Sequence, residues 1–229
     1  MCRNFGKLGN TLVLQFLYKK QSASYAEPKK NSARLRMKKI LTAIVLVFFC
    51  LSSANAFLAK TKQIDPEDYP FLLLAKDLQI YNIKLDLSGS AEKARLKKWI
   101  NGVYDIKYEY DRRDSEDFNA LFFSVKLEIE KNKKGAIETY REGLAVVTRT
   151  SAAVGMPCRE IKNTIKWGDE NYYAIREKNG NPVGLIFTGR LNNKVYTLIM
   201  AGLYSSDHSL ITDLVIPKLT HINDFQIKE

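Results

Sequence analysis

Cysteine and histidine are scarce in this chain of 229 residues, which contains three cysteines and two histidines. Cys2 and Cys50 both precede residue 57, so Cys158 is the single cysteine of residues 57–229 and no disulfide can form within that stretch. The dense disulfide framework that is typical of small secreted domains is therefore excluded there.

The chain also lacks the short motifs that identify common enzymes. It has no Gly-x-x-x-x-Gly-Lys loop, no Gly-x-Gly-x-x-Gly turn, no His-Glu-x-x-His motif and no Cys-x-x-Cys pair. His208 and His221 are 13 residues apart, a separation of about 20 Å along a straight helix. A metal site would need both of them with a carboxylate such as Asp207 or Asp213. We therefore expect surface histidines, no metal and no cofactor.

Cys158 and His208 are the one pair that could act as nucleophile and base, because Cys-His pairs recur on unrelated folds. Cys158 lies in "GMPCREI", a turn entering an expected strand. Free cysteine commonly behaves as a small buried hydrophobe, so we expect a structural thiol and no catalytic residues. An exported hydrolase-like enzyme that uses Cys158 and His208, or a pair of carboxylates, is the alternative.

Positive charge dominates the whole chain but not its larger part. The formal net charge is +11, and residues 1–56 hold 10 of the 36 basic and 1 of the 25 acidic residues. Residues 57–229 keep the other 26 basic and 24 acidic residues, a net charge of +2. Such a balance gives no electrostatic reason to expect a nucleic-acid partner.

Residues 37–56, "MKKILTAIVLVFFCLSSANA", have the three parts of a secretory signal peptide. Two lysines supply the positive n-region and the apolar run 40–51 supplies the h-region. Ala54 and Ala56 are the small residues before a cut at Phe57. The apolar run has 12 residues, whereas crossing a bilayer takes about 20, so we expect cleavage and a periplasmic or secreted domain.

An uncleaved inner-membrane anchor, Ile40–Ala59, is the alternative, and it would export the same following residues. We expect membrane contact only through this leader. Met37 is then the expected initiator, and residues 1–36 are an upstream extension outside the mature protein. Residues 57–229 number 173, the size of one globular domain. The absence of any Asn-x-Ser/Thr acceptor favours a bacterial periplasm.

Hydrophobic periodicity gives the expected elements of that domain. Helices are expected at residues 88–103 and 135–152 and from Ser206 onward, with Pro217 kinking or restarting the last one. Strands are expected at residues 78–87, 103–111, 119–132, 159–167, 171–178, 182–190 and 194–203. This order predicts an α+β domain, with an antiparallel sheet of about six to seven strands and helices packed on one face.

Four tyrosines are the candidate ligand-facing residues. Tyr108, Tyr110, Tyr172 and Tyr173 lie on expected strands and could form an aromatic surface for a ligand. Because tyrosine is also a favoured strand residue, packing on the sheet is the competing interpretation.

Three stretches of the sequence resemble the PsbP/Mog1-like fold, and especially its small exported bacterial members. They are "GAIETYREGLAVV" after a long strand, the hairpin "PVGLIFTGRLNNKVYTLIMAG", and the end "IPKLTHINDFQI", which closes on Phe225. The resemblance implies accessory roles in larger assemblies and no shared catalytic set. We therefore expect an exported, non-enzymatic binding or accessory protein, with a protein or small molecule as its partner.

Overall fold

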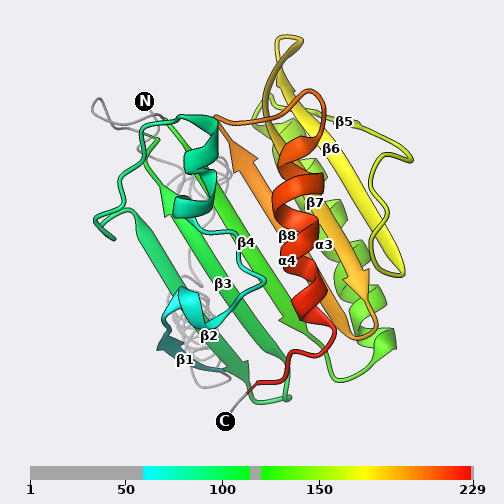
Figure 1. The fold of residues 1–229 in the computed structure, drawn as a ribbon. Coiled ribbons are helices and arrows are strands. Elements are labelled where there is room, and N and C mark those ends of the chain that lie inside the picture. Colours follow the sequence, from blue (N-terminus) through cyan, green and yellow to red (C-terminus); the bar gives the residue numbers. More distant parts are fainter. Residues whose placement is uncertain (1–58, 114–119, 228–229) are drawn as a thin grey trace, which may run out of the picture. The chain divides into compact units, whose positions relative to one another are not determined.

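The structure is a computed structural model, and it describes residues 59–113 and 120–227. All of them belong to one compact unit, Asn55–Glu229 (Figure 1). The expected signal peptide, with Ala54, Ala56 and Phe57 at its cut, lies outside the described residues, as does the extension 1–36.

Eight strands of the described part form one antiparallel sheet in the order β1-β2-β3-β4-β8-β7-β6-β5. The strands are β1 (Ala59–Gln63), β2 (Glu92–Trp99), β3 (Tyr104–Asp111), β4 (Phe122–Ile129), β5 (Cys158–Glu160), β6 (Glu170–Lys178), β7 (Asn181–Leu191) and β8 (Lys194–Ala201). The helical segments are η1 (Pro66–Asp68), η2 (Ala75–Tyr81), α3 (Lys133–Ala153), η3 (Leu210–Val215), α4 (Ile216–Leu219) and η4 (Thr220–Ile222).

The sheet consists of two four-stranded meanders that join where β4 pairs with β8. The helix α3 leads from β4 to β5 at the far edge, and β6, β7 and β8 then return to the centre. Asn132 caps α3, because its side-chain oxygen accepts a hydrogen bond of 2.9 Å from the amide of Gly135. The expected helix at residues 135–152 is confirmed.

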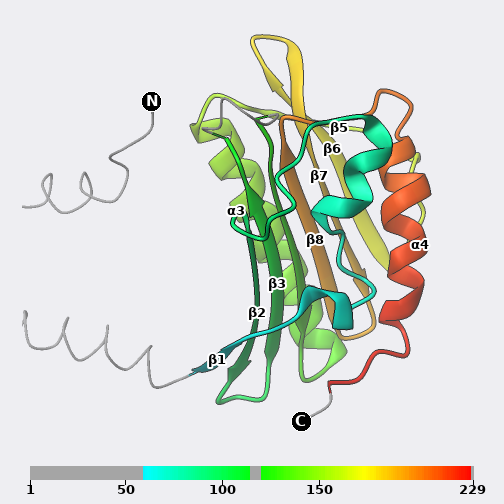
Figure 2. The ribbon, with the colours of Figure 1, turned by 60° about the vertical axis from the view of Figure 1, so that its left-hand side comes forward.

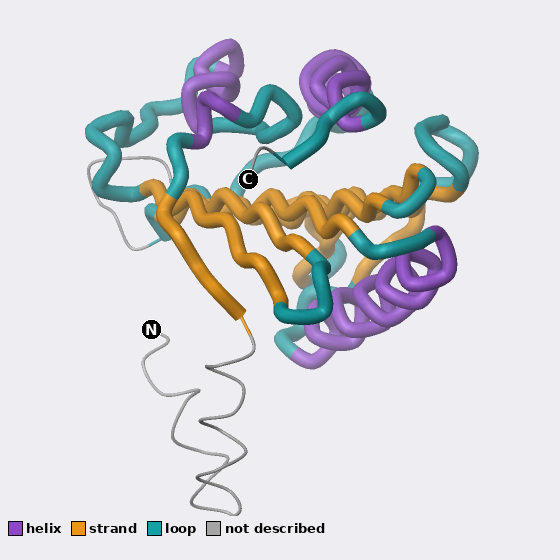
Figure 3. The backbone as a smooth tube through the Cα atoms, turned by 90° about the horizontal axis from the view of Figure 1, so that it is seen from below, coloured by secondary structure: helices purple, strands orange, loops and turns teal. Residues whose placement is uncertain are grey.

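The helices cover both faces of the sheet, as Figures 2 and 3 show. The segments η2, η3 and α4 pack on one face and build the main core. On the other face, Ala136 and Tyr140 of α3 pack against Val195 of β8. The antiparallel sheet is confirmed, and the α+β class is confirmed in part, because the sheet is larger than predicted and the helices of the described residues are few. The expectation of six to seven strands with helices on one face is wrong, because an alternating strand pattern does not reveal what covers its polar side.

The main core joins the beginning and end of the described chain. Phe225, after the last helix, packs against Phe71 at 4.8 Å and Tyr69 at 5.8 Å between ring centroids. The largest fully buried side chains come from the strands and the entry segment and include Tyr108, Tyr110, Tyr196, Phe71, Phe123 and Phe187. The expected last helix is confirmed as the run η3–α4–η4, and Pro217 lies in the first turn of α4.

The expected helix at residues 88–103 is wrong, because its centre forms strand β2. Ala94 and Leu96 are buried while Lys93 and Arg95 are exposed, which is the period of two of a strand. The sequence "EKARLKKW" is made almost wholly of good helix formers, so its helix propensity concealed this alternation. Pairing of β2 with both β1 and β3 outweighs that propensity.

Two expected strands are corrected as well. Residues 78–87 form the end of η2 and an irregular segment, separated by Asn82 in the left-handed conformation at φ 53°. Leu78 is fully buried, but Ile80 is 65% exposed, so the apolar residues do not share a face. Of the expected strand 159–167, only its start belongs to a strand, the short edge strand β5.

Candidate functional site

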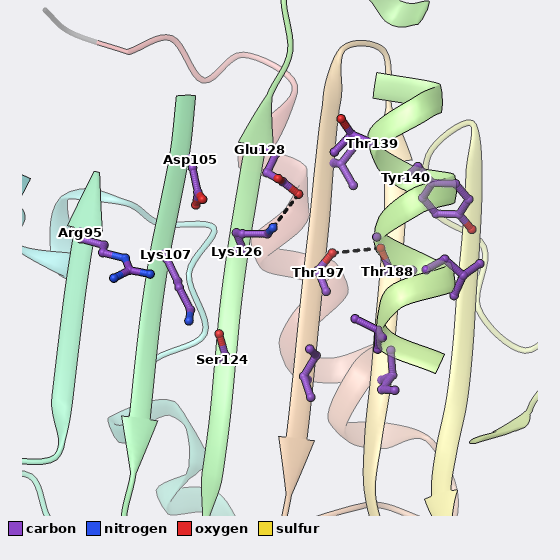
Figure 4. Close-up of a pocket in the computed structure, with 16 residues that line it drawn as sticks. Arg95, Asp105, Lys107, Ser124, Lys126, Glu128, Thr139, Tyr140, Thr188 and Thr197 are labelled. Atoms are coloured by element: carbon purple, nitrogen blue, oxygen red, sulfur yellow. Dashed lines mark hydrogen bonds and ion pairs between the residues drawn. The ribbon is translucent and has the colours of Figure 1, made fainter. Parts of the chain in front are cut away.

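A groove lies between α3 and the sheet on the face opposite the main core (Figure 4). Its volume is about 290 Å³. We call it the α3 groove. Its lining consists of Arg95, Asp105, Lys107, Ser124, Lys126, Glu128, Thr139, Tyr140, Gly143, Leu144, Val147, Ile186, Thr188, Val195, Thr197 and Ile199.

One wall and part of the floor of the groove are apolar. Tyr140, Leu144 and Val147 lie on one stripe of α3, because residues spaced by three or four share a helix face. Ile186 of β7 and Ile199 of β8 are cross-strand neighbours beneath them. The helix contacts mainly β7, β8 and β5. Among the described residues, no helix lies over the polar faces of β2, β3 and β4 beside it (Figure 3).

The other wall is a row of three positive side chains on adjacent strands. Arg95 of β2 lies opposite Lys107 of β3, and Lys107 lies opposite Lys126 of β4. We call these three residues the cationic row. It continues into Thr197 and Thr188, whose hydroxyl oxygens are 3.1 Å apart. Like charges directly opposite each other destabilise a sheet, so this arrangement is costly without an anion nearby.

Glutamates offset two of the three positive charges. Lys107 forms an ion pair of 2.5 Å with Glu109, and Lys126 forms one of 2.9 Å with Glu128. Arg95 is exposed, and within the described ranges its side chain has no ion pair or hydrogen bond. Its charge is therefore the one in the row that no carboxylate of the described residues neutralises.

Two carboxylates lie across the strands from one another at the same wall. Asp105 is the cross-strand partner of Glu128, and Asp105 Oδ1 is buried without a hydrogen-bond partner in the described part of the chain. Burial raises the pKa of Glu128. The charges of Asp105 and Glu130 raise it further, and Lys126 opposes the rise. The groove therefore contains one carboxylate whose protonated form is favoured by its surroundings.

The four candidate tyrosines do not form one surface. Tyr108 and Tyr110 are fully buried in the main core, where their hydroxyls accept hydrogen bonds from the amides of Ala75 at 3.0 Å and Asp86 at 2.9 Å. These two bonds tie the start of η2 and the irregular segment after it to β3. Tyr172 and Tyr173 are neighbours on β6, so their side chains point to opposite faces.

Tyr173 belongs to the main core, whereas Tyr172 is half-buried on the α3 side, where it lies opposite Thr188. The hydroxyl of Tyr173 is 3.2 Å from Nδ1 of His208, and burial raises the pKa of Tyr173 to about 12. A ligand-facing role for all four tyrosines at once is incompatible with these positions. Tyr172 alone lies on the face that carries the α3 groove.

Cys158 and His208 do not meet. Cys158 is the cross-strand partner of Arg176, on the α3 side of the sheet, whereas His208 contacts Tyr173 on the core side. No group of three or more His, Cys, Asp or Glu side chains that could hold a metal ion occurs in residues 59–113 and 120–227. The described residues thus offer neither a Cys-His pair nor a metal cluster.

Arg176 is a buried cation on the α3 side of the sheet. It is 9% exposed, its Nε has no hydrogen-bond partner in the described chain, and one terminal nitrogen lies 3.4 Å from the sulfur of Met156. Burial lowers the pKa of its guanidinium, while the nearby Cys158 opposes that change. Arg176 does not line the α3 groove.

A second ion cluster stands beside the groove on the same face. Arg190 of β7 pairs with Asp169 and Glu170, both at 2.6 Å, and Lys133 at the start of α3 reaches Asp169 at 3.3 Å. Burial tends to raise the pKa of Asp169, but hydrogen bonds from Arg190 and Lys133 lower it overall. The cluster links the first turn of α3 to the β5–β6 connection and so helps to position the helix over the sheet.

No helix of the described residues has the length and apolar character needed to cross a membrane. Comparisons of the chain with family models, with curated proteins and with solved structures found no match.

Proposed function

We propose that the protein is an exported, non-enzymatic binding or accessory module that holds a small ligand in the α3 groove. The groove itself is the observation that carries this proposal. Its volume of about 290 Å³ is at the lower end of ligand pockets, which span roughly 300–1,000 Å³. It also combines an apolar wall with a few convergent polar groups, which is the usual lining of a small-molecule site.

Export is proposed from the leader at residues 37–56, and its cleavage at Phe57 is proposed with it. The membrane-anchored alternative retains Ile40–Ala59, and fractionation of cells with and without detergent distinguishes the two. The antiparallel sheet with few helices is compatible with the proposed PsbP/Mog1-like resemblance, which supports a binding or accessory role over a catalytic one.

Gly143 offers a direct test of the groove. It lies on the groove side of α3, and a Cβ atom added there meets no other atom within 4 Å. The backbone position therefore accepts a side chain, and Gly143→Phe should place a ring in the groove; it also removes a glycine from a helix interior. Val146→Phe is the matched control, because Val146 is on the same helix and is 60% exposed.

The ligands for this test are octanol, octanoate and octylammonium, measured by isothermal titration calorimetry on the full chain. We expect at least one of them to bind to the wild type and to Val146→Phe, and to lose binding in Gly143→Phe. Equal binding to all three proteins, or to none of them, contradicts the proposal.

An acid-base enzyme is the second candidate, favoured by one observation. Asp105 and Glu128 face the groove as cross-strand partners, and burial, reinforced by the charge of Asp105, raises the pKa of Glu128. Such a carboxylate can act as a general acid. Hydrolysis of nitrophenyl esters or glycosides by the wild type, lost in Glu128→Gln with the fold intact, would establish this activity in place of simple binding.

A further inference from the structure

We infer that the α3 groove binds a small amphipathic monocarboxylate, with its carboxylate on the cationic row and its apolar chain against α3. This inference rests on the proposed function, because it names the ligand class of the same site.

The charge of the lining favours an anion. Three cationic side chains and two carboxylates line the groove, so its formal charge is +1. The positive charges are gathered on one register row, Arg95, Lys107 and Lys126, while both carboxylates lie on the neighbouring row. A ligand anion over the cationic row relieves the repulsion between like charges that face each other across strands.

Arg95 distinguishes a carboxylate from a more highly charged group. Lys107 and Lys126 already have glutamate partners, and Arg95 has no ion pair in the described ranges. A guanidinium matches a carboxylate through two parallel hydrogen bonds. A doubly charged phosphate would bring a second negative charge close to the Asp105 and Glu128 carboxylates, and of the three cations that line the groove only Arg95 has no ion pair among the described residues.

The shape of the groove favours an apolar chain of limited length. Its inner part is walled by Leu144 and Val147 of α3 and floored by Ile186 and Ile199. A volume of about 290 Å³ is close to the lower limit of roughly 300 Å³ for ligand pockets. A short chain such as that of octanoate, with eight carbons and two oxygens, suits a groove of this size.

Figure 4 shows how the two parts of such a ligand would be held. Arg95 extends from β2 toward Lys107 on β3, and Lys126 points toward Glu128, whereas Tyr140 projects from α3 on the opposite side. The hydroxyls of Thr197 and Thr188 lie between the charged wall and the helix. The lining of the groove therefore changes from charged at the cationic row, through the two threonine hydroxyls, to apolar at α3.

The test compares ligands of equal chain length on the full chain by calorimetry. We expect sodium octanoate to bind at least about tenfold more tightly than octanol, octylammonium or octyl phosphate. Its affinity should fall as the salt concentration is raised. Arg95→Gln should weaken the binding of octanoate by about tenfold, the scale of one charge-assisted contact, and leave the binding of octanol unchanged. Arg95→Gln is a clean substitution because it leaves no described carboxylate without its partner.

Lys178→Gln is the control for net charge, because Lys178 is exposed in the β6–β7 hairpin and does not line the groove. It should leave octanoate binding unchanged. Tighter binding of octyl phosphate, octanol or octylammonium, or an equal loss in Lys178→Gln and Arg95→Gln, overturns the carboxylate assignment. If octanol still binds and Gly143→Phe abolishes it, the binding function stands and only the ligand class is wrong. If no ligand responds to Gly143→Phe, the proposed function itself fails.

Discussion

Arg190 is more deeply buried than its two carboxylate partners, and this difference predicts which substitutions lower the stability of the α3 face most. Its side chain is 5% exposed, whereas the carboxylates of Asp169 and Glu170 are 28% and 33% exposed. Removing the arginine by Arg190→Met leaves two carboxylates that water can reach. Removing both charges by Asp169→Asn with Glu170→Gln leaves a guanidinium that water cannot reach.

The expected costs follow from these exposures. An uncompensated buried charge costs about 3–5 kcal/mol, so we expect this loss in the free energy of unfolding for the double substitution. Arg190→Met loses hydrogen bonds to two carboxylates that water can still reach, and we expect about 1–2 kcal/mol. For a domain of this size about 1 kcal/mol lowers Tm by roughly 2–4 °C, which gives about 6–20 °C and about 2–8 °C respectively.

Urea unfolding followed by tryptophan fluorescence measures both variants, since Trp167 packs near Phe187 in the same half of the sheet. Glu67→Gln is the control, because its ion pair with Lys76 is exposed and such pairs contribute about 1 kcal/mol or less. A loss in Arg190→Met equal to or larger than that of the double substitution would refute the claim that burial of the guanidinium sets the cost.

Three further predictions concern buried polar groups. Burial raises the pKa of Glu128 above its ordinary value of 4.5, so the folded state holds that proton more tightly than the unfolded state and the resulting stability is lost as pH rises through the raised pKa. Urea titrations should therefore show Glu128→Gln gaining stability relative to the wild type from pH 4 to pH 8. A difference in stability that stays constant over this range contradicts the prediction. Arg176→Met should keep or raise Tm in calorimetric scans, since it replaces a buried cation that lacks a carboxylate partner among the described residues. A fall of more than about 4 °C, the equivalent of 1–2 kcal/mol, would contradict it. Tyr196→Phe removes a buried hydroxyl that has no partner in the described chain, and it should raise the free energy of unfolding. Tyr108→Phe leaves the Ala75 amide unpaired and should lower the free energy of unfolding by about 1–3 kcal/mol. The opposite order of the two urea midpoints would refute both assignments.

The elements whose hydrophobic pattern agrees with the intrinsic propensity of their residues were predictable from the sequence. The strands β3 and β4 alternate apolar and polar residues along the chain, β6, β7 and β8 are rich in β-branched and aromatic residues, and α3 carries a helical stripe after a capping asparagine. Each of these patterns agrees with the intrinsic propensity of its residues. Propensity and burial then point to the same structure, so a local reading succeeds.

The predicted secondary structure is wrong where the local propensity of a segment disagrees with its tertiary contacts. In β2, Lys93, Arg95 and Leu96 all favour a helix, yet the segment fills the space between β1 and β3. In residues 78–87, apolar residues predict a strand, although the segment is not paired in the sheet; the amides of Ala75 and Asp86, before and within it, donate to the hydroxyls of Tyr108 and Tyr110 on β3. Neither partner is visible in the local sequence, because both contacts join residues far apart in the chain.

The α3 groove was not predictable for a related reason. Arg95, Lys107 and Lys126 are 12 and 19 positions apart in the sequence, and each lies on a polar strand face that also fits simple solvation. They become one row only through the registers of β2, β3 and β4, and a shift of one residue would send any of them to the core side. The row becomes a wall of a groove only because α3 lies over β7 and β8, leaving the charged strands beside the helix. The binding specificity proposed here is thus a property of register and helix placement, which explains why motif searches along the chain give no indication of it.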